Sequence, residues 1–346
     1  MNYSHNKLKI FCSKILVSVG VSQLNSEIVS RNLINADLRN IPSHGIARLP
    51  NYVKRIQLGL INPNPNVKVV NTSHATCLLD GDNCLGQIAA EKAILKAIEI
   101  TQERGLSIVG VKNTNHIGIA SSYVLKAAKK GMIGFCLANG SAHMAPWGGK
   151  TPILGTNPIS IAIPAGRFNE IVLDMATSVT ARGKIILAAE KGEKIPIGWA
   201  LNKEGNPTNN PKEAMLGTIL PLGGYKGFGL SLIVDILSGV LTGSSYGSKI
   251  PSMTENFSKK LNEGIFLGAF KVNNFIDIKL FEERIENYIL EIKNSPTAPG
   301  VTEIFFPGEL EHKAMKKNLE MGIKIDRNIC KNLNILAEKL NIDEIL

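Results

Sequence analysis

Apolar residues recur at helical spacing along the first part of the chain. They form stripes over residues 8–19, 24–36 and 49–56, and each stripe predicts one face of an amphipathic helix. Ser22 and Asn25 are candidate N-caps for the second helix, because their side-chain oxygens can accept a hydrogen bond from the first turn. The N-terminal segment is therefore predicted to be helical.

The pattern changes at Asn62-Pro63-Asn64-Pro65, where two prolines in four residues favour a linker. From residue 67 short apolar runs alternate with longer helical patterns. The short runs predict strands at 75–79, 107–111, 133–137, 159–163, 171–173, 265–270 and 303–306. The longer patterns predict helices at 86–104, 118–130, 181–190, 227–241 and 278–293. After Pro307-Gly308 the pattern is helical to the end of the chain.

This alternation is typical of the α/β class, in which helices pack on a mixed or largely parallel sheet. Because both ends are helical and the middle is different, we expect a helical domain formed from both chain termini around a central α/β body. We divide the chain into residues 1–66 and 307–346, which form the two parts of the helical domain, and residues 67–306, which form the central body.

Composition limits the class of protein. The 346 residues are 44% hydrophobic and 20% charged, which excludes wholesale disorder and a collagen-like repeat. The 39 Lys and Arg against 29 Asp and Glu give a net charge of +10. This charge admits a nucleic acid, a membrane surface or an acidic small molecule as partner, or only a lysine-rich surface. Aromatic residues are only 5% and no binding module is recognisable, which argues against a nucleic acid.

The chain lacks signs of export or membrane insertion. Its five cysteines are odd in number and include no C-x-x-C pair, as expected for reduced thiols in the cytosol. Lys14 interrupts the first apolar stretch, so it does not make a signal peptide. The longest apolar segment, 228–241, contains Asp235 and is shorter than the roughly 20 residues of a membrane helix. We expect a soluble, cytoplasmic protein that does not bind membranes.

Several well-known site motifs are absent. There is no G-x-G-x-x-G fingerprint, Walker A loop, H-E-x-x-H or G-x-S-x-G. The six histidines are scattered without metal-ligand spacing, so we expect no metal site.

Charge distribution points to an anion site. Residues 104–169 contain no carboxylate but seven cations, and they include His116, His143 and Gly140. Exposed backbone N–H groups near positive charge favour phosphate or carboxylate. The alternative is that the lysines of the predicted helix 118–130 only solvate its outer face.

A first candidate constellation is Ser43-His44-Gly45 followed by Arg48 and Tyr52. A helix running from His44 would place His44, Arg48 and Tyr52 on one face. Pro50 favours instead a kink, or a helix that restarts at Leu49. Arginine offers a planar fork for a carboxylate, and histidine handles a proton near neutral pH. The alternative is a capping histidine and a surface arginine.

Two further candidates lie beside predicted helices. His116 lies in a loop that follows a predicted strand, at the end where open α/β sheets bind ligands. Lys226 follows Gly223-Gly224 at the start of the predicted helix 227–241. A cation at a helix N-terminus does not complement the helix dipole, so an anion from outside is a reasonable partner. A flexible hinge is the alternative for these glycines.

Seven motifs in this order resemble the malate/L-lactate dehydrogenase family, and the resemblance covers nearly the whole chain. They are Ser43-His44-Gly45 with Arg48 and Tyr52, Asn115-His116-Ile117-Gly118, Met144-Ala145-Pro146-Trp147-Gly148-Gly149, Gly155-Thr156-Asn157-Pro158, Leu173-Asp174-Met175-Ala176-Thr177, Gly223-Gly224-Tyr225-Lys226-Gly227 and Phe306-Pro307-Gly308-Glu309. This family lacks a Rossmann fold, and its members act on malate, lactate, sulfolactate, ureidoglycolate or diketogulonate.

The resemblance implies an oxidoreductase that uses NAD or NADP, with NAD favoured, and a homodimer with active sites near the subunit interface. By matching motifs it implies cofactor contacts at Gly140, Ser141, Asp174, Met175, Ala176, Lys226, Pro307, Gly308 and Glu309. There are departures from the family pattern. Gly140 replaces a frequent polar side chain, so only its backbone can make a contact. His143 replaces a small or apolar residue.

The resemblance also implies the reaction, which is hydride transfer between a nicotinamide and a small 2-hydroxy or 2-oxo acid. Malate or L-lactate is favoured as substrate over ureidoglycolate, sulfolactate or diketogulonate. We expect His116 to relay the proton of the 2-hydroxyl, Arg48 to hold the carboxylate, and Ser43 and His44 to hydrogen-bond the substrate. In relatives either histidine has been assigned the relay, so His44 stays an alternative. A cofactor-free hydrolase or lyase of a 2-oxo or ureido acid, and a non-enzymatic binding protein, are the competing classes.

Overall fold

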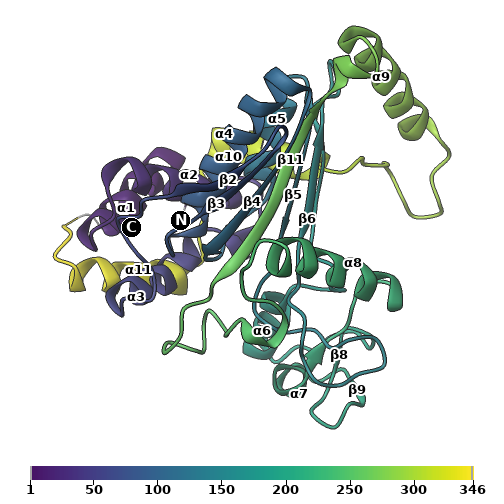
Figure 1. Ribbon diagram of the computed structural model, residues 1–346. Coiled ribbons are helices and arrows are strands. Elements are labelled where there is room, and N and C mark those ends of the chain that lie inside the picture. The colour runs from purple at the N-terminus through teal and green to yellow at the C-terminus, as the bar shows by residue number, and fades with distance from the viewer. Residues whose placement is uncertain (1, 344–345) are drawn as a thin grey trace.

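The centre of the protein is a seven-stranded mixed sheet (Figure 1). The computed structural model describes residues 2–343 and 346. In spatial order the strands are β2 (Lys68–Thr72), β3 (Thr76–Asp80), β4 (Leu106–Thr114), β11 (Glu263–Lys271), β5 (Met132–Ala138), β6 (Ile159–Ile163) and β7 (Ile171–Met175). The predicted α/β class with a mixed sheet is confirmed.

The expectation of a largely parallel sheet is wrong. Only β3 and β4 run parallel, and every other neighbouring pair is antiparallel. The pairs β2–β3, β5–β6 and β6–β7 are antiparallel neighbours along the chain, and β11 enters from far down the chain and inserts between β4 and β5 in the opposite direction. Its first residues therefore lie at the sheet edge where β4 and β5 end.

Helices cover both faces of the sheet. On one face α4 (Gly86–Arg104) packs on β4 and β11, and α5 (Ser121–Ala128) packs on β5 and β6. On the other face lie α8 (Tyr225–Asp235) and the π-helical turn Ile236–Val240 that continues it. The predicted helix 118–130 begins only at Ser121, because the chain turns at Gly118 with a positive φ of 72°.

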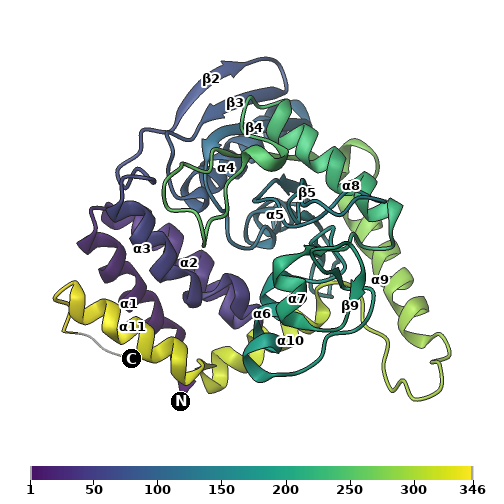
Figure 2. The same cartoon turned by 90° about the horizontal axis from the view of Figure 1, so that it is seen from below.

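A helical layer is formed from both chain ends. The N-terminal part contributes α1 (His5–Ser18), α2 (Gln23–Leu38) and α3 (Leu49–Gln57), and the C-terminal part α10 (Glu309–Met321) and α11 (Arg327–Lys339). The short strands β1 (Asn2–Tyr3) and β12 (Ile323–Lys324) pair with each other, so the termini lie close together (Figures 1 and 2). This confirms the predicted layer, while the exact domain limits stay a prediction.

A small lobe stands between β7 and α8 in the chain. It contains α6 (Arg182–Lys191), α7 (Pro211–Leu216) and a sheet of three two-residue strands, β8 (Ala200–Leu201), β9 (Pro207–Thr208) and β10 (Thr218–Ile219). Ile185, Ile195 and Ile219 are buried in its own apolar core. The sequence predicted α6 but not these strands, nor β2, which is exposed throughout.

The predicted strand at 303–306 is wrong. After α9 (Ile278–Asn294) the chain crosses over to the edge of β7, where one backbone hydrogen bond, from Val172 N–H to Pro307 O at 2.9 Å, joins the two segments. Phe306 packs with Ala165 and Ile289 in a separate apolar cluster. Burial of this side chain, rather than strand pairing, explains the apolar pattern.

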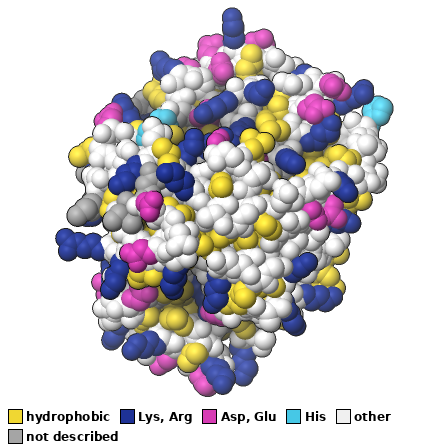
Figure 3. Space-filling model, turned by 90° about the vertical axis from the view of Figure 1, so that its left-hand side faces the viewer, with side chains coloured by type: hydrophobic (Ala, Val, Ile, Leu, Met, Phe, Trp, Pro, Cys, Tyr) yellow, Lys and Arg dark blue, Asp and Glu magenta, His cyan; other side chains and the backbone are white. Residues whose placement is uncertain are grey.

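Over the described residues, the face of the molecule seen in Figure 3 shows no concentrated basic patch. Among the residues that the structure describes, no helix is long and apolar enough to span a membrane. On the face seen in Figure 3, lysine and arginine side chains are spread out and interspersed with acidic ones. Most of the net positive charge on that face is therefore solvated surface.

The turn between α2 and α3 depends on the buried carboxyl of Asp37. Its Oδ2 accepts a hydrogen bond from Ile46 N–H at 2.8 Å. A Cβ atom at Gly45 would lie 1.9 Å from Oδ1 of Asp37, so only glycine fits there. Burial raises the pKa of Asp37 to about 7, against the opposing effect of the Ile46 N–H group.

The first prediction concerns Asp37→Asn. A carboxyl whose pKa is raised on folding stabilises the protein below its unfolded pKa and loses this contribution as pH rises through the folded pKa. From pH 5 to pH 8 we expect the wild type to lose about 2 kcal/mol more unfolding free energy than the variant does. Urea denaturation across this range measures it, with the exposed Glu320→Gln as control. Parallel curves for wild type and Asp37→Asn would contradict the assignment.

Candidate active site

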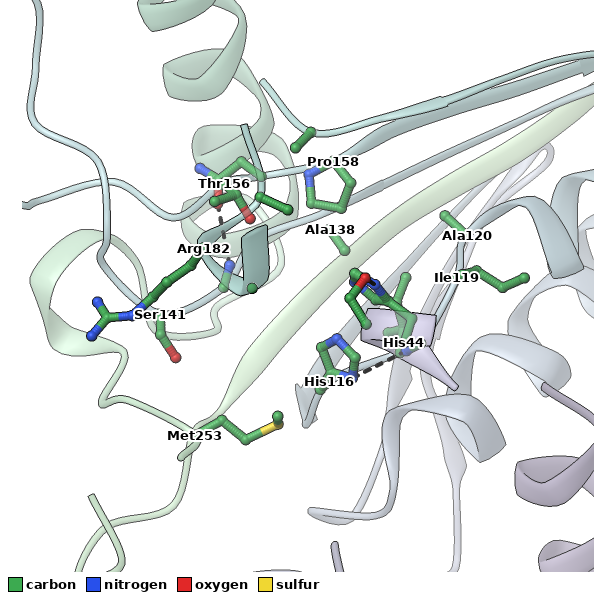
Figure 4. A pocket seen from close by; sticks show the side chains of 18 of the residues that line it. His44, His116, Ile119, Ala120, Ala138, Ser141, Thr156, Pro158, Arg182 and Met253 are labelled. Carbon is green, nitrogen blue, oxygen red and sulfur yellow. Dashed lines mark hydrogen bonds between the residues drawn. The ribbon is translucent and has the colours of Figure 1, made fainter. Parts of the chain in front are cut away.

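A cleft opens at the sheet edge where β4, β5 and β7 end. Its lining brings together nine of the thirteen residues predicted from the sequence: Ser43, His44, Arg48, His116, Gly140, Ser141, Asp174, Met175 and Ala176. Figure 4 shows the rings of His44 and His116 close together on one side, with Thr156 and Pro158 on another. A second pocket continues the cleft, shares Ile41 and Asp174 with it, and is lined by Pro307 and Gly308.

The segment that carries Ser43, His44 and Arg48 is not a continuous helix. Two 3₁₀ turns, Pro42–His44 and Ile46–Arg48, precede α3, which begins at Leu49. The helix expected to run from His44 is therefore wrong, and the alternative of a restart at Leu49 is confirmed. Pro50 lies in the first turn of α3, where its missing N–H costs no helical hydrogen bond.

Hydrogen bonds between backbone and side chains fix the conformation of the segment from Ser43 to Arg48. Ser43 O accepts a hydrogen bond from Arg48 Nε at 2.6 Å, and Ser43 Oγ lies 2.9 Å from His44 Nδ1. In the described part of the chain the guanidinium of Arg48 has no acidic partner. Its outer nitrogens are therefore available to an anion in the cleft.

His116 is held from behind by its own loop and by α3. Gly118 N–H donates to His116 Nδ1 at 3.3 Å, and Tyr52 Oη lies 2.7 Å from the same nitrogen. Gln87 Nε2 in turn donates to Tyr52 Oη at 2.8 Å. Because a backbone N–H can only donate, Nδ1 is an acceptor here, and the neutral ring carries its proton on Nε2.

His44 and His116 are two of the three histidines that line the cleft, and both are neutral at physiological pH. Burial, and then the positive charges of His44 and Arg48, lower the pKa of His116 well below its usual value. Burial and then Arg48 lower the pKa of His44 to about 4. The rings stack with centroids 5.3 Å apart, an arrangement in which two cationic rings would repel each other.

Buried asparagines fix the loops that carry the site. Asn115 Nδ2 donates to Cys84 O at 2.7 Å. Asn139 Nδ2 donates to Ser245 O at 2.8 Å, and its Oδ1 accepts from Gly264 N–H at 2.9 Å. Asn157 Oδ1 accepts from Gly140 N–H at 3.2 Å. These amides replace the strand hydrogen bonds that the backbone loses as it leaves the sheet.

The far side of the cleft can hold an anionic, hydroxyl-rich group. Asp174 Oδ2 accepts Ser121 N–H at 2.8 Å, and burial raises the pKa of this carboxyl. Arg39 lines the second pocket, is only 8% exposed, and its Nε has no partner among the described residues. A buried cation with an unused donor fits a phosphate.

Two predicted residues lie outside the cleft lining. Glu309 accepts hydrogen bonds from Lys293 Nζ at 2.8 Å and from Phe306 N–H at 3.3 Å, so it braces the turn that carries Pro307 and Gly308. Lys226 is exposed at the start of α8.

The cleft also contains residues that sequence reasoning missed. Arg182 donates to His143 Nδ1 at 2.8 Å and pairs with Glu255 at 2.6 Å, and its guanidinium points away from the two central histidines in Figure 4. Glu263, the first residue of β11, lines the cleft beside Gly140. Only the antiparallel insertion of β11 brings Glu263 to this edge, so the sequence carried no usable signal for it.

Metal ligands do not gather in the cleft. Over residues 2–343 and 346 there is no cluster of three His, Cys, Asp or Glu side chains that could hold a metal ion.

Comparison with known proteins gives a consistent result. The chain is 39% identical over 330 residues to the malate/(S)-sulfolactate dehydrogenase of Methanothermus fervidus, covering 95% of each chain. It is 40% identical over 345 residues to a malate dehydrogenase of Pyrococcus abyssi, covering 97% of this chain and 94% of the relative.

A solved structure shares the whole fold. The sulfolactate dehydrogenase of Methanocaldococcus jannaschii superposes with a TM-score of 0.92 at 38% identity, covering 99% of this chain and 98% of that one. A sequence profile described as malate/L-lactate dehydrogenase matches residues 3–334. The chain therefore belongs to the malate/L-lactate dehydrogenase family.

Proposed function

We propose that this protein is an NAD- or NADP-dependent dehydrogenase of a small 2-hydroxy acid, with malate or L-lactate as the favoured substrates. The observation that carries the proposal is the meeting of His116 and Arg48 in one cleft. One group handles a proton, and the other offers an unpaired cation to a carboxylate. Family membership and the names of the relatives support the same reaction.

The second half of the cleft fits a dinucleotide. Asp174, Met175, Ala176 and the backbone of Gly140 and Ser141 would hold the nicotinamide half. Arg39, Pro307 and Gly308 in the adjoining pocket would hold the phosphates and the second nucleoside. When bound, the nicotinamide supplies the acceptor or donor of the hydride at C2 of the substrate.

Arg48 positions the substrate in this proposal. A bidentate contact with the C1 carboxylate fixes the direction in which C2 points. Ser43 anchors Arg48 through its carbonyl oxygen and His44 through its hydroxyl. The C2 oxygen then lies toward His116.

His116 handles the proton at the C2 oxygen. Its Nε2–H donates to the oxygen of a 2-oxo acid and stabilises the negative charge that develops there. In the direction of oxidation Nε2 must be free to accept the hydroxyl proton, so the ring proton must first move to Nδ1, which then donates to Tyr52 Oη instead of accepting from Gly118 N–H. The Tyr52 hydroxyl can donate to Nδ1 or accept from it, so the 2.7 Å contact supports both states of the ring.

We also propose a homodimer formed through α8. One side of this helix, with Ser231, Val234 and Asp235, is buried against the body of the protein. The other side exposes Ile233 (54%) and Leu241 (63%), the latter just beyond the π-helical turn. An exposed helix face of apolar side chains is normally covered by another protein surface. A second copy would bury this face, and the exposed Lys226 at its end would then reach the partner's cleft.

The second prediction tests the reaction. When the protein is titrated with NADH and with NADPH, binding should enhance or quench the fluorescence of at least one of these two cofactors. With that cofactor, 2-hydroxy acids should be oxidised, as followed by absorbance of the reduced nicotinamide. Turnover of a ureido or 2-oxo acid without any nicotinamide would instead favour the hydrolase or lyase class. Binding of neither cofactor would end the dehydrogenase proposal.

The third prediction concerns the proton relay. His116→Asn should lower kcat by about 10²- to 10⁴-fold, the usual contribution of general acid–base catalysis. Tyr52→Phe should lower kcat by about tenfold with little change in KM, because it removes one hydrogen bond to the ring and no substrate contact. Steady-state kinetics measure both. Near-wild-type turnover of His116→Asn together with an inactive His44→Asn would transfer the relay to His44.

The fourth prediction tests the dimer. Ile233→Glu should place a charge in the proposed interface and convert the dimer into a monomer, as measured by sedimentation. Cofactor affinity should fall as the partner's lysine is lost. Leu24→Glu, which changes an exposed leucine on α2 in the helical layer, is the matched control. A monomeric wild type, or an Ile233→Glu variant that stays dimeric, would contradict the proposal.

A further inference from the structure

A buried carboxyl in the cleft has no role in the mechanism described above. Glu263 is only 5% exposed and lines the cleft. No hydrogen bond or ion pair joins its carboxyl to any described residue. Its Oε1 lies 3.9 Å from the place where a Cβ on Gly140 would be. An unpartnered buried carboxyl beside a substrate cleft points to a contact with the ligand.

The sheet places Glu263 at the substrate end of the cleft. Glu263 pairs with Thr114, two residues before His116, and Ile265 pairs with Ala138, two residues before Gly140. A register shift between Glu263 and Ile265 re-aims the side chains there, as bulges next to active sites commonly do. The cofactor motif at the end of β7 lies three strands away. Glu263 therefore lies between the strand that leads to His116 and the strand that leads to Gly140, where the proposed substrate and nicotinamide would meet.

The charges around Glu263 favour its protonated form. Arg55 on α3 is the cation that acts on it, but this guanidinium is fully buried and donates to the carbonyl oxygens of Asn256 and Lys259 at 2.8 and 2.7 Å. Burial outweighs Arg55 and raises the pKa of Glu263 to about 8. The other titratable or charged groups that line the cleft are His44, Arg48, His116, His143, Asp174 and Arg182, while Tyr52 and Asp235 lie behind the lining.

Charge balance then indicates the ligand. With His44, His116 and Glu263 neutral, two positive charges remain near this end of the cleft: Arg48, which lines it, and the buried Arg55, which acts on Glu263 from outside the lining. The C1 carboxylate of any 2-hydroxy acid neutralises one of them. A second acidic group would neutralise the other and would accept the hydrogen bond that Glu263 can donate. A methyl group would leave this donor unpaired.

We propose that Glu263 selects 2-hydroxy acids that carry a second acidic group, a carboxylate or a sulfonate, by donating a hydrogen bond to that group. The proposal rests on the proposed dehydrogenase function and names the substrate class within it. Of the two substrates favoured above, malate is then preferred, and lactate, with a methyl group, is a poorer substrate, as is ureidoglycolate, with an uncharged ureido group.

Steady-state kinetics with malate, sulfolactate, lactate and ureidoglycolate at pH 7 and pH 9 test this. For wild type we expect kcat/KM at pH 7 to be at least about tenfold higher with the two diacids than with lactate, as expected for a hydrogen bond to a charged group. Between pH 7 and pH 9 KM for the diacids should rise about tenfold as Glu263 ionises and repels them, while KM for lactate should not.

Two variants at Glu263 distinguish the effect of its hydrogen bond to the substrate from the effect of the side chain's size. Glu263→Gln keeps a donor, so it should retain the preference for diacids at pH 7 and lose the rise of KM at pH 9. Glu263→Ala should lose between about tenfold and hundredfold in kcat/KM for diacids, and much less for lactate. Glu283→Gln, an exposed glutamate on α9, is the control for removing one carboxylate.

Several results would overturn the proposal. One is a Glu263→Gln variant as impaired as Glu263→Ala, because an ionised carboxylate would then be the active form. Others are a preference for lactate or ureidoglycolate, or equal effects of both variants on all four substrates. In each of these cases the enzyme still turns over and the dehydrogenase proposal survives. Absence of any nicotinamide-dependent turnover would overturn both.

Discussion

The loops of the cleft are held by buried asparagine amides where the strands stop. A strand that ends inside a protein leaves backbone N–H and C=O groups that must find other partners. Asn139 fills this need for three segments, since it contacts Asp235 on α8, the carbonyl oxygen of Ser245 and the N–H group of Gly264 at the start of β11. The loops of the site are thus fixed to the sheet by several hydrogen bonds of one side chain, and a small movement of Asn139 would break all of them.

The same constraint explains which parts of the fold could be predicted from sequence. Periodicity locates α4 and β6 because each is stabilised by burying one regular pattern of side chains. It cannot locate β8 or β9, which contain two residues each and are held by tertiary pairing. It also misassigned 303–306, because an apolar run packed into a satellite cluster has the same pattern as a strand.

In the candidate site, too, residues of local motifs could be predicted from the sequence, and residues placed by tertiary structure could not. His116 and Arg48 belong to short local motifs, so the resemblance found them, and the turn that carries Arg48 is governed by the nearby Pro50. Glu263 could not be found in this way, because its place depends on the direction and register in which β11 enters the sheet. Tyr52 was noted as a neighbour of Arg48 in sequence, yet its contact is with the ring of His116, 64 positions away.

Neutrality is the electrostatic principle of the cleft. Burial disfavours charge here, so His44, His116 and Glu263 are held in their uncharged forms, while the arginines keep their charge. Because the two histidines and Glu263 are uncharged, they do not repel or attract one another strongly, and each can still donate or accept a proton. The anionic substrate then supplies the negative charge that balances the arginines. Gly140 belongs to this arrangement. A Cβ atom there would lie 3.9 Å from Oε1 of Glu263, an ordinary van der Waals distance, so this carboxyl lines the cleft directly beside the Gly140 backbone.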